Sequence, residues 1–472
     1  MGSPFKALVK VGCCSTILLG LPLGAQTVPG VANARTLPGN GDLGAKINSY
    51  FSSCSPACTL YLPAGTYTYS TTITIAPPAF ATYRLMGEKG TVLKYGGSGD
   101  AIFVTSNHVG QVGVANLQIS GFQLLGTSSG VDGIRIQPTN GVTVDQMLIS
   151  GFSAGSGIWL EGPNSMSIQN SILINNQYGI MAESTFCSRA SPYACSPTGP
   201  GIEYDPNGVH IHDNYIAANG KWGIFLQTPS GHGIARSNIV ASNVLENNGS
   251  ASPVYGDIFM SRDQGTVIEG NYFEASPRHI VLGTKGSGPV SQSSGDHITG
   301  NYFNSAKTAP YNIELEDARW TVIDANNDYY ISGKICEIHT PGAGDEYGTV
   351  VGLNGFTTGN YLTCVGAGTF PAYLPGANSF TQPVTQSVTF SGCRIPAGSI
   401  GTICIASGQW PAPFAGTPSS VVCSMASAGD GANTVGALTG ISKSGVNVQE
   451  ISLSTAAAGG GSITCRGEWS SN

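Results

Sequence analysis

One short phrase recurs through the middle of the chain: DGIRI at residues 132–136, GIWL at 157–160, GIMA at 179–182, GIFL at 223–226, DIFM at 257–260, HIVL at 279–282 and NIEL at 312–315. Each copy places an isoleucine before alternating apolar positions, and the shortest spacing is 22 residues, as between Ile158 and Ile180. A unit of this length with two or three short strands cannot bury its inward side chains alone, so such units stack into a solenoid. Because the Leu-x-x-Leu-x-Leu frame of leucine-rich repeats is absent, the phrase predicts an all-β parallel β-helix.

The composition is typical of a protein rich in strands and turns. Of 472 residues, 66 are glycine, 10% are charged and 41% are hydrophobic. A helical bundle would need more Ala, Leu, Glu and Lys, and a chain this apolar can bury a large core, which argues against disorder. The formal net charge of −7 disfavours contact with phosphates, so we expect no nucleic-acid partner.

The beginning of the chain has the pattern of an export signal. Lys6 and Lys10 precede an apolar run over residues 16–23, which is followed by small residues. We predict a signal peptide over residues 1–25, or alternatively 1–34, and a protein secreted to the extracellular or periplasmic space. The apolar run is too short to span a bilayer, so we expect no membrane insertion.

Two parts follow the signal. Residues 36–340 carry the β-helix, and its first coil needs a cap, which Asp42 can begin as the N-cap of a short helix. The apolar residues on one face of this helix are Leu43, Ile47, Tyr50 and Phe51. Residues 341–472 lose the repeat and are predicted to form a small C-terminal β domain braced by disulfides.

Ten cysteines remain after the signal, an even number in an oxidising compartment. Their order suggests local pairs, with other connectivities left open: Cys54–Cys58, Cys187–Cys195, Cys336–Cys364, Cys393–Cys404 and Cys423–Cys465. Paired Cys-x-x-Cys spacings are absent, which favours disulfides over zinc. The second pair lies in an excursion over residues 184–205, which we expect to build a wall on one edge of the solenoid.

Three N-terminal stretches carry a family resemblance: GDLGAKINSYF at 41–51, TLYLPAGTYTYSTTITI at 59–75 and YRLMGEKGTVLKYGGSGD at 83–100. They resemble the opening of pectate-lyase-superfamily β-helix proteins, and the architecture is similar to that of polygalacturonases and phage tailspike depolymerases. The resemblance implies a right-handed parallel β-helix and, most often, polysaccharide cleavage.

Motifs of single members of this superfamily are matched in part. Asp132 precedes Gly-Ile as in the polygalacturonase strand, whereas Gly155-Ser156 stands where that family has two adjacent aspartates. His232, within Gly-His-Gly, resembles another polygalacturonase motif but lies beyond the Gly-Ile strand. Asp205, within Tyr-Asp-Pro-Asn, resembles alginate epimerases, although this is also an ordinary turn sequence.

Strand alternation predicts which side chains the stacked phrases present to the outside. One outward column contains Arg135, Trp159, Met181, Phe225, Phe259, Val281 and Glu314, and the next contains Gln137, Glu161, Glu183, Gln227, Ser261, Gly283 and Glu316. A file of exposed rings costs free energy unless an inserted loop or a bound glycan covers it. We predict a glycan-binding surface made of Arg135, Trp159, Trp222, Phe225, Gln227 and Phe259.

Two groups of charged residues are candidates for catalysis. Glu161 and Glu183 fall on neighbouring coils, and their repulsion predicts one protonated and one ionised carboxyl, as glycosidic cleavage requires, with Asp132 assisting. The second group can abstract a proton in a lyase and consists of Asp257, Arg262, Asp263 and His279, with Arg278 beside them. The alternative for both groups is a solvated surface of ion pairs.

We predict no metal site, because His210 and His212 share a strand without an evident third ligand. No cofactor is expected, except calcium if the chemistry is elimination. The leading hypothesis is a secreted glycoside hydrolase or polysaccharide lyase with a polysaccharide substrate. A non-catalytic glycan-binding or cell-surface adhesion β-helix is the alternative, and the oligomeric state stays open.

Overall fold

The computed structural model describes residues 31–328, with gaps at 79, 106–113, 128, 188–194, 197–200, 229–231, 285–292 and 305–308. Further along, it describes residues 336–340, 349–351, 354, 361–365, 384–391, 403–409, 420–426, 434–442, 445–452 and 462–469. The predicted signal peptide lies outside the described residues. Within these ranges, no helix is long and apolar enough to cross a membrane.

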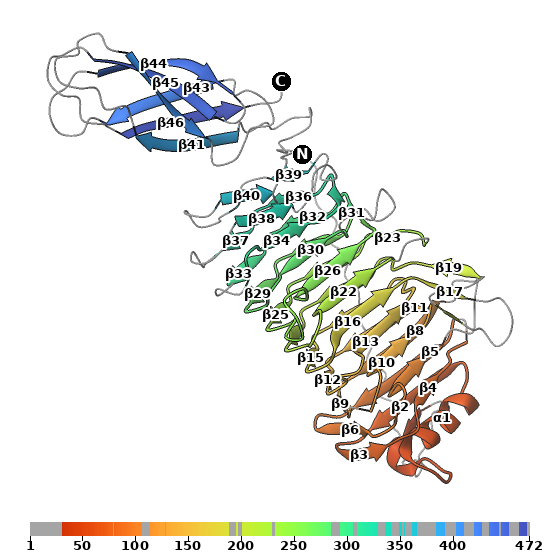
Figure 1. Ribbon diagram of the computed structural model, residues 1–472. Coiled ribbons are helices and arrows are strands. Elements are labelled where there is room, and N and C mark those ends of the chain that lie inside the picture. Colours follow the sequence, from red (N-terminus) through yellow and green to blue (C-terminus); the bar gives the residue numbers. More distant parts are fainter. Residues whose placement is uncertain are drawn as a thin grey trace, which may run out of the picture.

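Three long parallel sheets run side by side along a right-handed β-helix, which confirms the predicted fold (Figure 1). Sheet A consists of β1 (Val31–Asn33), β2 (Ala57–Leu62), β5 (Thr82–Gly87), β8 (Val114–Ser120), β11 (Asn140–Asp145), β14 (Ser167–Gln169), β20 (His210–His212), β24 (Ile239–Ala241), β28 (Val267–Glu269), β32 (His297–Thr299), β36 (Val322–Asp324) and β39 (Val350–Val351). Sheet B consists of β3 (Gly65–Tyr69), β6 (Thr91–Tyr95), β9 (Gln123–Leu125), β12 (Leu148–Ser150), β15 (Ile172–Ile174), β21 (Tyr215–Ala217), β25 (Val244–Glu246), β29 (Tyr272–Glu274), β33 (Tyr302–Asn304) and β37 (Asn327–Asp328). Sheet C consists of β4 (Ile73–Ile75), β7 (Ile102–Val104), β10 (Ile134–Ile136), β13 (Ser156–Glu161), β16 (Tyr178–Glu183), β22 (Ile224–Gln227), β26 (Ile258–Ser261), β30 (Ile280–Leu282), β34 (Ile313–Leu315), β38 (Cys336–Thr340) and β40 (Tyr361–Val365).

Smaller sheets complete the chain. The excursion forms an antiparallel sheet of β17 (Thr185–Cys187), β18 (Cys195–Ser196) and β19 (Ile202–Tyr204). A fourth parallel sheet contains β23 (Ala235–Arg236), β27 (Asp263–Gln264), β31 (Ser293–Ser294) and β35 (Ala318–Arg319). The C-terminal part forms two three-stranded antiparallel sheets, of β41 (Val384–Ser391), β46 (Ser462–Trp469) and β43 (Ser420–Ala426), and of β42 (Ile403–Gln409), β45 (Gly445–Ser452) and β44 (Thr434–Ile441).

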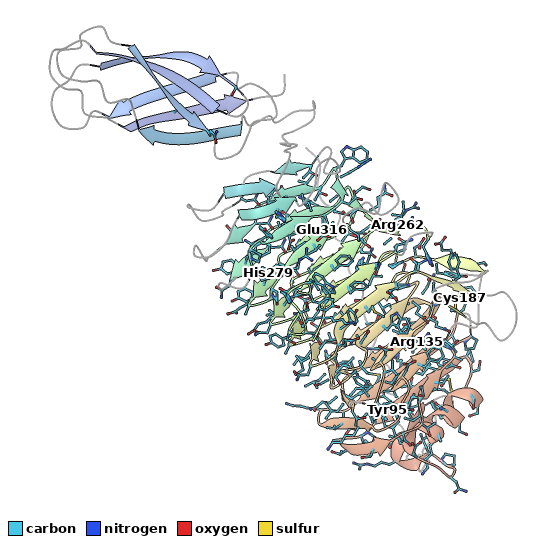
Figure 2. The ribbon with its side chains drawn as sticks, in the orientation of Figure 1. Tyr95, Arg135, Cys187, Arg262, His279 and Glu316 are labelled. Atoms are coloured by element: carbon cyan, nitrogen blue, oxygen red, sulfur yellow. A yellow bond between two sulfur atoms is a disulfide. The ribbon has the colours of Figure 1, made fainter. Side chains whose placement is uncertain are left out.

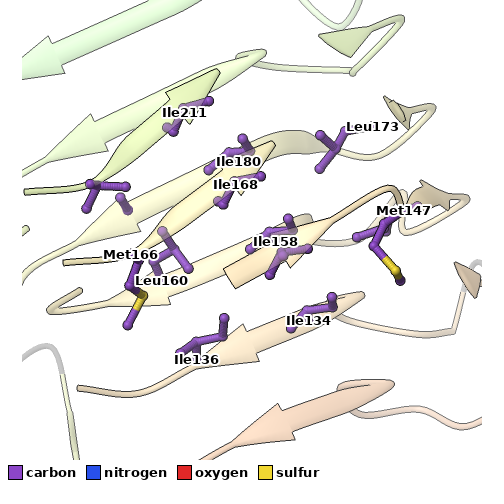
Figure 3. Packing of buried hydrophobic residues seen from close by; sticks show 14 of the residues in the cluster. Ile134, Ile136, Met147, Ile158, Leu160, Met166, Ile168, Leu173, Ile180 and Ile211 are labelled. Carbon is purple, nitrogen blue, oxygen red and sulfur yellow. The ribbon is translucent and has the colours of Figure 1, made fainter. Parts of the chain in front are cut away.

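The isoleucines of the repeated phrase form one continuous column inside sheet C. Each is the register partner of the next, and the column extends the predicted set in both directions: Ile73, Ile102, Ile134, Ile158, Ile180, Ile224, Ile258, Ile280, Ile313 and Ile338. All are at most 1% exposed, and Figure 3 shows several of them packed over the residues of the other sheets. Burial of each contributes about 1.5–3 kcal/mol, so the column is a main source of the solenoid's stability.

A ladder of buried asparagines joins the coils where sheet A turns into sheet B. Its members are Asn214, Asn243, Asn271, Asn301, Asn326 and Asn354. The Nδ2 of each donates to the Oδ1 of the next at 2.9–3.0 Å, and that Oδ1 also accepts the backbone N–H of the preceding member. In the coil before Asn214 the position belongs to Ser171, whose backbone N–H donates to Oδ1 of Asn214.

Left-handed backbone at the preceding residue makes the first five of these corners. The residues before Asn214 to Asn326 in the ladder are Asp213, Ser242, Gly270, Gly300 and Ala325, with φ of 54–63°. Such a conformation costs a non-glycine residue about 1–2 kcal/mol. The ladder hydrogen bonds offset this cost, because each satisfies buried backbone groups that the corner leaves without a strand partner.

The N-terminal cap is helix α1 (Leu43–Ser53), as predicted from its apolar spacing. Asp42 accepts the Ala45 N–H at 3.1 Å and, through its other oxygen, the N–H groups of Ser70 and Thr71. Ile47 and Phe51 are buried, and Leu43 and Tyr50 pack against the core: the helix therefore covers the first coil.

The β-helix is longer than the repeat had indicated. β1 pairs with β2 ahead of residue 36, and β38 and β40 continue sheet C past residue 340, as far as Val365. A cleavage after residue 34 would remove β1, whereas cleavage after residue 25 would leave it in place.

Two predicted disulfides are confirmed, Cys54–Cys58 and Cys187–Cys195. Cys465 is disulfide-bonded, and Cys423 is its register partner, the placement that the predicted pair requires. The backbones of Cys336 and Cys364 are offset by three residues in the register of β38 and β40, and their side chains lie outside the described residues, so this pair stays a prediction. Cys393 lies outside the described residues.

We expect Asn271→Ala to lower the free energy of unfolding by about 2–4 kcal/mol, since Asn271 is 1% exposed and its side chain makes four ladder bonds. Chemical denaturation of the purified protein measures this change. The control is Asn327→Ala, two strands further along sheet B and exposed, for which the change should stay below about 0.5 kcal/mol. Equal effects of the two substitutions would contradict a stabilising role of the ladder.

Candidate functional site

The outward face of sheet C carries the predicted column in the predicted register. The column begins one coil earlier than expected and contains Phe103, Arg135, Trp159, Met181, Phe225, Phe259, Val281 and Glu314. The first six are partly exposed, whereas Val281 is fully buried and Glu314 is 6% exposed, so the open part of the file ends at Phe259. Figure 2 shows Arg135 on this face, near the middle of the solenoid.

Ring contacts organise this file into two platforms. The guanidinium of Arg135 lies 4.3 Å from the ring centre of Trp159 and 5.5 Å from that of Phe103. Two coils further on, Phe225 and Phe259 are stacked with centres 5.1 Å apart. Partly exposed rings of this kind offer flat apolar surface beside hydrogen-bonding groups, which suits the faces of sugar rings.

Trp222 does not belong to the open surface, contrary to the prediction that it contacts a glycan. It is 4% exposed, because its ring packs on Phe259 at 5.3 Å and against the edge of Tyr255. Trp222 is thus a buried residue that packs against Phe259 of the second platform.

Beside the first platform, Glu161 and Glu183 are direct register partners on β13 and β16, as predicted. Arg135 binds Glu161 through two hydrogen bonds of 3.1 and 2.9 Å, and its third nitrogen lies 3.6 Å from Asp100. Glu161 is 1% exposed, so it is a buried, paired carboxylate and not the solvated group that strand alternation had predicted. Gln227 continues this second column on the next coil.

The pKa of Glu183 is raised, first by burial and then by the charges of Glu161 and Asp132. Burial also raises the pKa of Asp132 to about 6, against the hydrogen bond from the Ser156 N–H, which lowers it. The group thus combines a carboxylate paired with arginine and carboxyls whose pKa values are raised, the condition for a proton donor.

The second predicted catalytic group is divided between separate places. Asp257 and His279 form a pair, with Nδ1 and Oδ2 2.7 Å apart, and both are buried in the core beneath Phe273 and Phe303. Asp257 also accepts bonds from Asn248 and Ser276. Because neither side chain reaches solvent, a substrate cannot contact this pair.

Arg262 and Asp263 lie at the opposite end of the same coil, and Figure 2 shows Arg262 well away from His279. Arg262 donates to the backbone carbonyl of His232 and has 7% of its surface exposed. Asp263 is fully buried and accepts a bond from Thr266, with a pKa that burial raises to about 6. A shared role in proton abstraction therefore has no geometric basis.

The excursion after Glu183 stands at the edge of this site, as expected of a wall. Ser184 donates to Asp205 at 2.6 Å, at the point where the excursion returns to the solenoid. Within the described ranges, one group of side chains can hold a metal ion: Glu203, Asp205 and His232. Sequence reasoning missed it, although Glu-x-Asp at the excursion's end, followed by a histidine one coil later, was a usable signal.

Comparison with known families gives one match. The family described as "Periplasmic copper-binding protein (NosD)" matches residues 79–253 and 202–337, which together span more than half of the chain. No curated protein matches the sequence significantly.

Solved structures share the architecture at low identity. The surface adhesin PfbA of Streptococcus pneumoniae is 13% identical, with 74% of this chain and 96% of that chain covered and a TM-score of 0.52. The tailspike gp61 of Pseudomonas phage phi297 is 11% identical, with 94% and 100% covered and a TM-score of 0.44. An alginate lyase of Paenibacillus is 15% identical, with 66% and 97% covered and a TM-score of 0.42. Identity this low supports the β-helix fold alone.

The copper of the family description can be compared with the donors present. Glu203, Asp205 and His232 offer one imidazole and carboxylate oxygens, without a thiolate or thioether. Such a set suits Cu²⁺ or Zn²⁺, whereas Cu⁺ prefers sulfur. These residues therefore fit copper in its divalent state.

We expect Asp132→Asn to stabilise the protein at pH 7.5 by about 2–3 kcal/mol, because the folded pKa of about 6 exceeds the ordinary 3.8. The folded state then binds more protons than the unfolded state between about pH 4 and 6, so wild-type stability falls as pH rises through this window. The asparagine variant lacks this fall, and the difference should vanish near pH 4. Denaturation at both pH values measures it, with exposed Glu269→Gln as the control; an equal shift at both pH values would refute the assignment.

Proposed function

The chain belongs to the NosD family, and we propose that it is an exported β-helix protein that binds an extended polysaccharide along sheet C and cleaves it with Glu183 as proton donor. The observation that supports this most is the placement of Glu183: a carboxyl with a raised pKa beside the Arg135–Glu161 pair, on the coil between the two ring platforms. The confirmed disulfides fit an oxidising, extracytoplasmic compartment.

Binding would use the two platforms. Trp159 and Arg135 form the first, and Phe225 and Phe259 the second, so a chain lying along the solenoid axis crosses both. Lys221 lies 5.0 Å from the ring centre of Tyr178, close to the second platform, and pairs with no carboxylate among the described residues. A cation in this position favours acidic sugars over neutral ones.

Cleavage would proceed by hydrolysis. The proton of Glu183 passes to the glycosidic oxygen as the bond to the anomeric carbon breaks, water adds to that carbon, and the proton it loses restores Glu183. Glu161 acts through its neighbours: its charge holds Arg135 in place and keeps the pKa of Glu183 high. It is thus a positioning residue and not the second catalytic carboxyl that the sequence had suggested.

Binding without cleavage is the second candidate, and one observation favours it. Glu161 is 1% exposed and paired with Arg135, so only one carboxyl of the Glu161–Glu183 pair is accessible, whereas most glycosidases use two. A surface protein that holds glycans needs only the platforms.

We expect Glu183→Gln to lower the turnover of a cleaved polysaccharide by about 10²–10⁴-fold while binding is retained, because glutamine keeps the shape but cannot donate the proton. Wild-type turnover should fall as pH rises through the raised pKa of Glu183. Purified protein screened against uronate-containing and neutral glycans, with reducing ends as the readout, identifies the substrate.

Glu269→Gln, an exposed carboxyl on sheet A, is the matched control and should leave turnover unchanged. Glycan binding without product in the wild type would establish the second candidate. Full turnover by the Glu183→Gln variant would remove Glu183 from the mechanism while leaving the binding surface intact.

A further inference from the structure

Three potential metal ligands come together where the excursion rejoins the solenoid. Glu203 lies in β19, Asp205 follows that strand, and His232 belongs to the next coil; one donor atom of each lies within 4.8 Å of the others. The Cys187–Cys195 bond closes the excursion, and the ring of Phe186 packs on that of His232 at 4.4 Å. Both contacts hold the ligands' backbones close together.

The imidazole of His232 is buried and aimed at the carboxylates. Its side chain is 5% exposed, and Nδ1 lies 3.2 Å from Oε1 of Glu203, yet this nitrogen makes no hydrogen bond to any described residue. A buried side-chain nitrogen normally makes a hydrogen bond, and this one lies near an acceptor without the geometry of a hydrogen bond. Two ligands on one ion at about 2.1 Å lie about 3.0–3.4 Å apart, and the 3.2 Å between Nδ1 of His232 and Oε1 of Glu203 falls in this range.

Neighbouring groups orient each carboxylate, and Oε1 of Glu203, the oxygen that lies near His232, accepts one hydrogen bond and can accept a further partner. Ser184 donates to Oδ1 of Asp205, and the N–H of Gly233 donates to Oε1 of Glu203. No described residue donates to Oδ2 of Asp205 or to Oε2 of Glu203. Fixed ligand carboxylates with outer hydrogen bonds are typical of metal sites.

Gly233 makes the approach of Asp205 sterically feasible. A Cβ at this position would lie 2.0 Å from Oδ2 of Asp205, so any larger residue would displace that oxygen. Glycine is therefore needed here to leave room for the Asp205 carboxylate, since Gly233 does not have a left-handed backbone.

We propose that Glu203, Asp205 and His232 bind a divalent transition-metal ion of the Cu²⁺ or Zn²⁺ class. One imidazole and two carboxylates leave a coordination position open for water or ligand, as in catalytic zinc sites. Calcium is disfavoured, since it takes six to eight oxygens, and Cu⁺ is disfavoured by the lack of sulfur. The ion joins the excursion to the following coil, next to Glu183, and this site does not depend on the proposed glycan cleavage.

The test uses the full exported protein after removal of bound metal with a chelator. Titration with Zn²⁺ or Cu²⁺, followed by calorimetry, should show one tight equivalent and a raised unfolding temperature. His232→Gln and Glu203→Gln should each weaken binding by at least about 100-fold, and Gly233→Ala by at least about 10-fold. The Cu²⁺ form should show nitrogen hyperfine splitting in its EPR spectrum, lost in His232→Gln.

His212→Gln is the matched control, because His212 also pairs with a carboxylate, Asp213, at 2.7 Å, but is partly exposed. It should leave the tight equivalent unchanged. No tight equivalent, equal affinity for Ca²⁺, or unchanged binding by His232→Gln would each overturn the proposal and leave a His–Glu ion pair. Circular dichroism of the metal-free variants confirms that each is folded.

Discussion

The whole molecule depends on the register between successive coils. Each strand hydrogen-bonds to its equivalent in the next coil, so side chains far apart in the chain become neighbours in columns. A slip of one residue would move the isoleucines of sheet C to the outside and Arg135 and Trp159 into the core. The isoleucine column and the asparagine ladder both oppose that slip, the first through burial and the second through hydrogen bonds that no other register can make.

The same register forces like charges together. Glu161 and Glu183 cannot separate as they would on loops, because their strands are fixed at the spacing of a sheet. Arg135 pairs with Glu161, and the pKa of Glu183 is raised, first by burial and then by the charges of Glu161 and Asp132. A stack of parallel strands can thus raise the pKa of a carboxyl without any special loop.

Wherever strands alternate regularly, the sequence was sufficient to predict the fold and the neighbours in a column. It failed at corners, because the residue before each isoleucine lies where the chain turns: Asp257 and His279 face the core there instead of solvent. It also could not predict that Arg135 would bury Glu161, since this depends on a side chain reaching across a coil. The group of Glu203, Asp205 and His232 depends on how an antiparallel excursion folds back, and its length alone does not specify that path.

Residues of an insertion are not held in the columns that the stacked strands form. The candidate metal ligands of this solenoid lie where such an insertion rejoins it. The excursion leaves sheet C directly after Glu183 and returns so that β20 stacks on β14 in unbroken register. Its ends must therefore meet at one edge, and there Ser184 links the acid-bearing strand to Asp205. A buried histidine from the next coil completes a cluster that repeating columns cannot make, because they place identical positions 4.8 Å apart in a line and not around a point. The proposed metal site at this edge thus depends on an interruption of the repeat directly after Glu183.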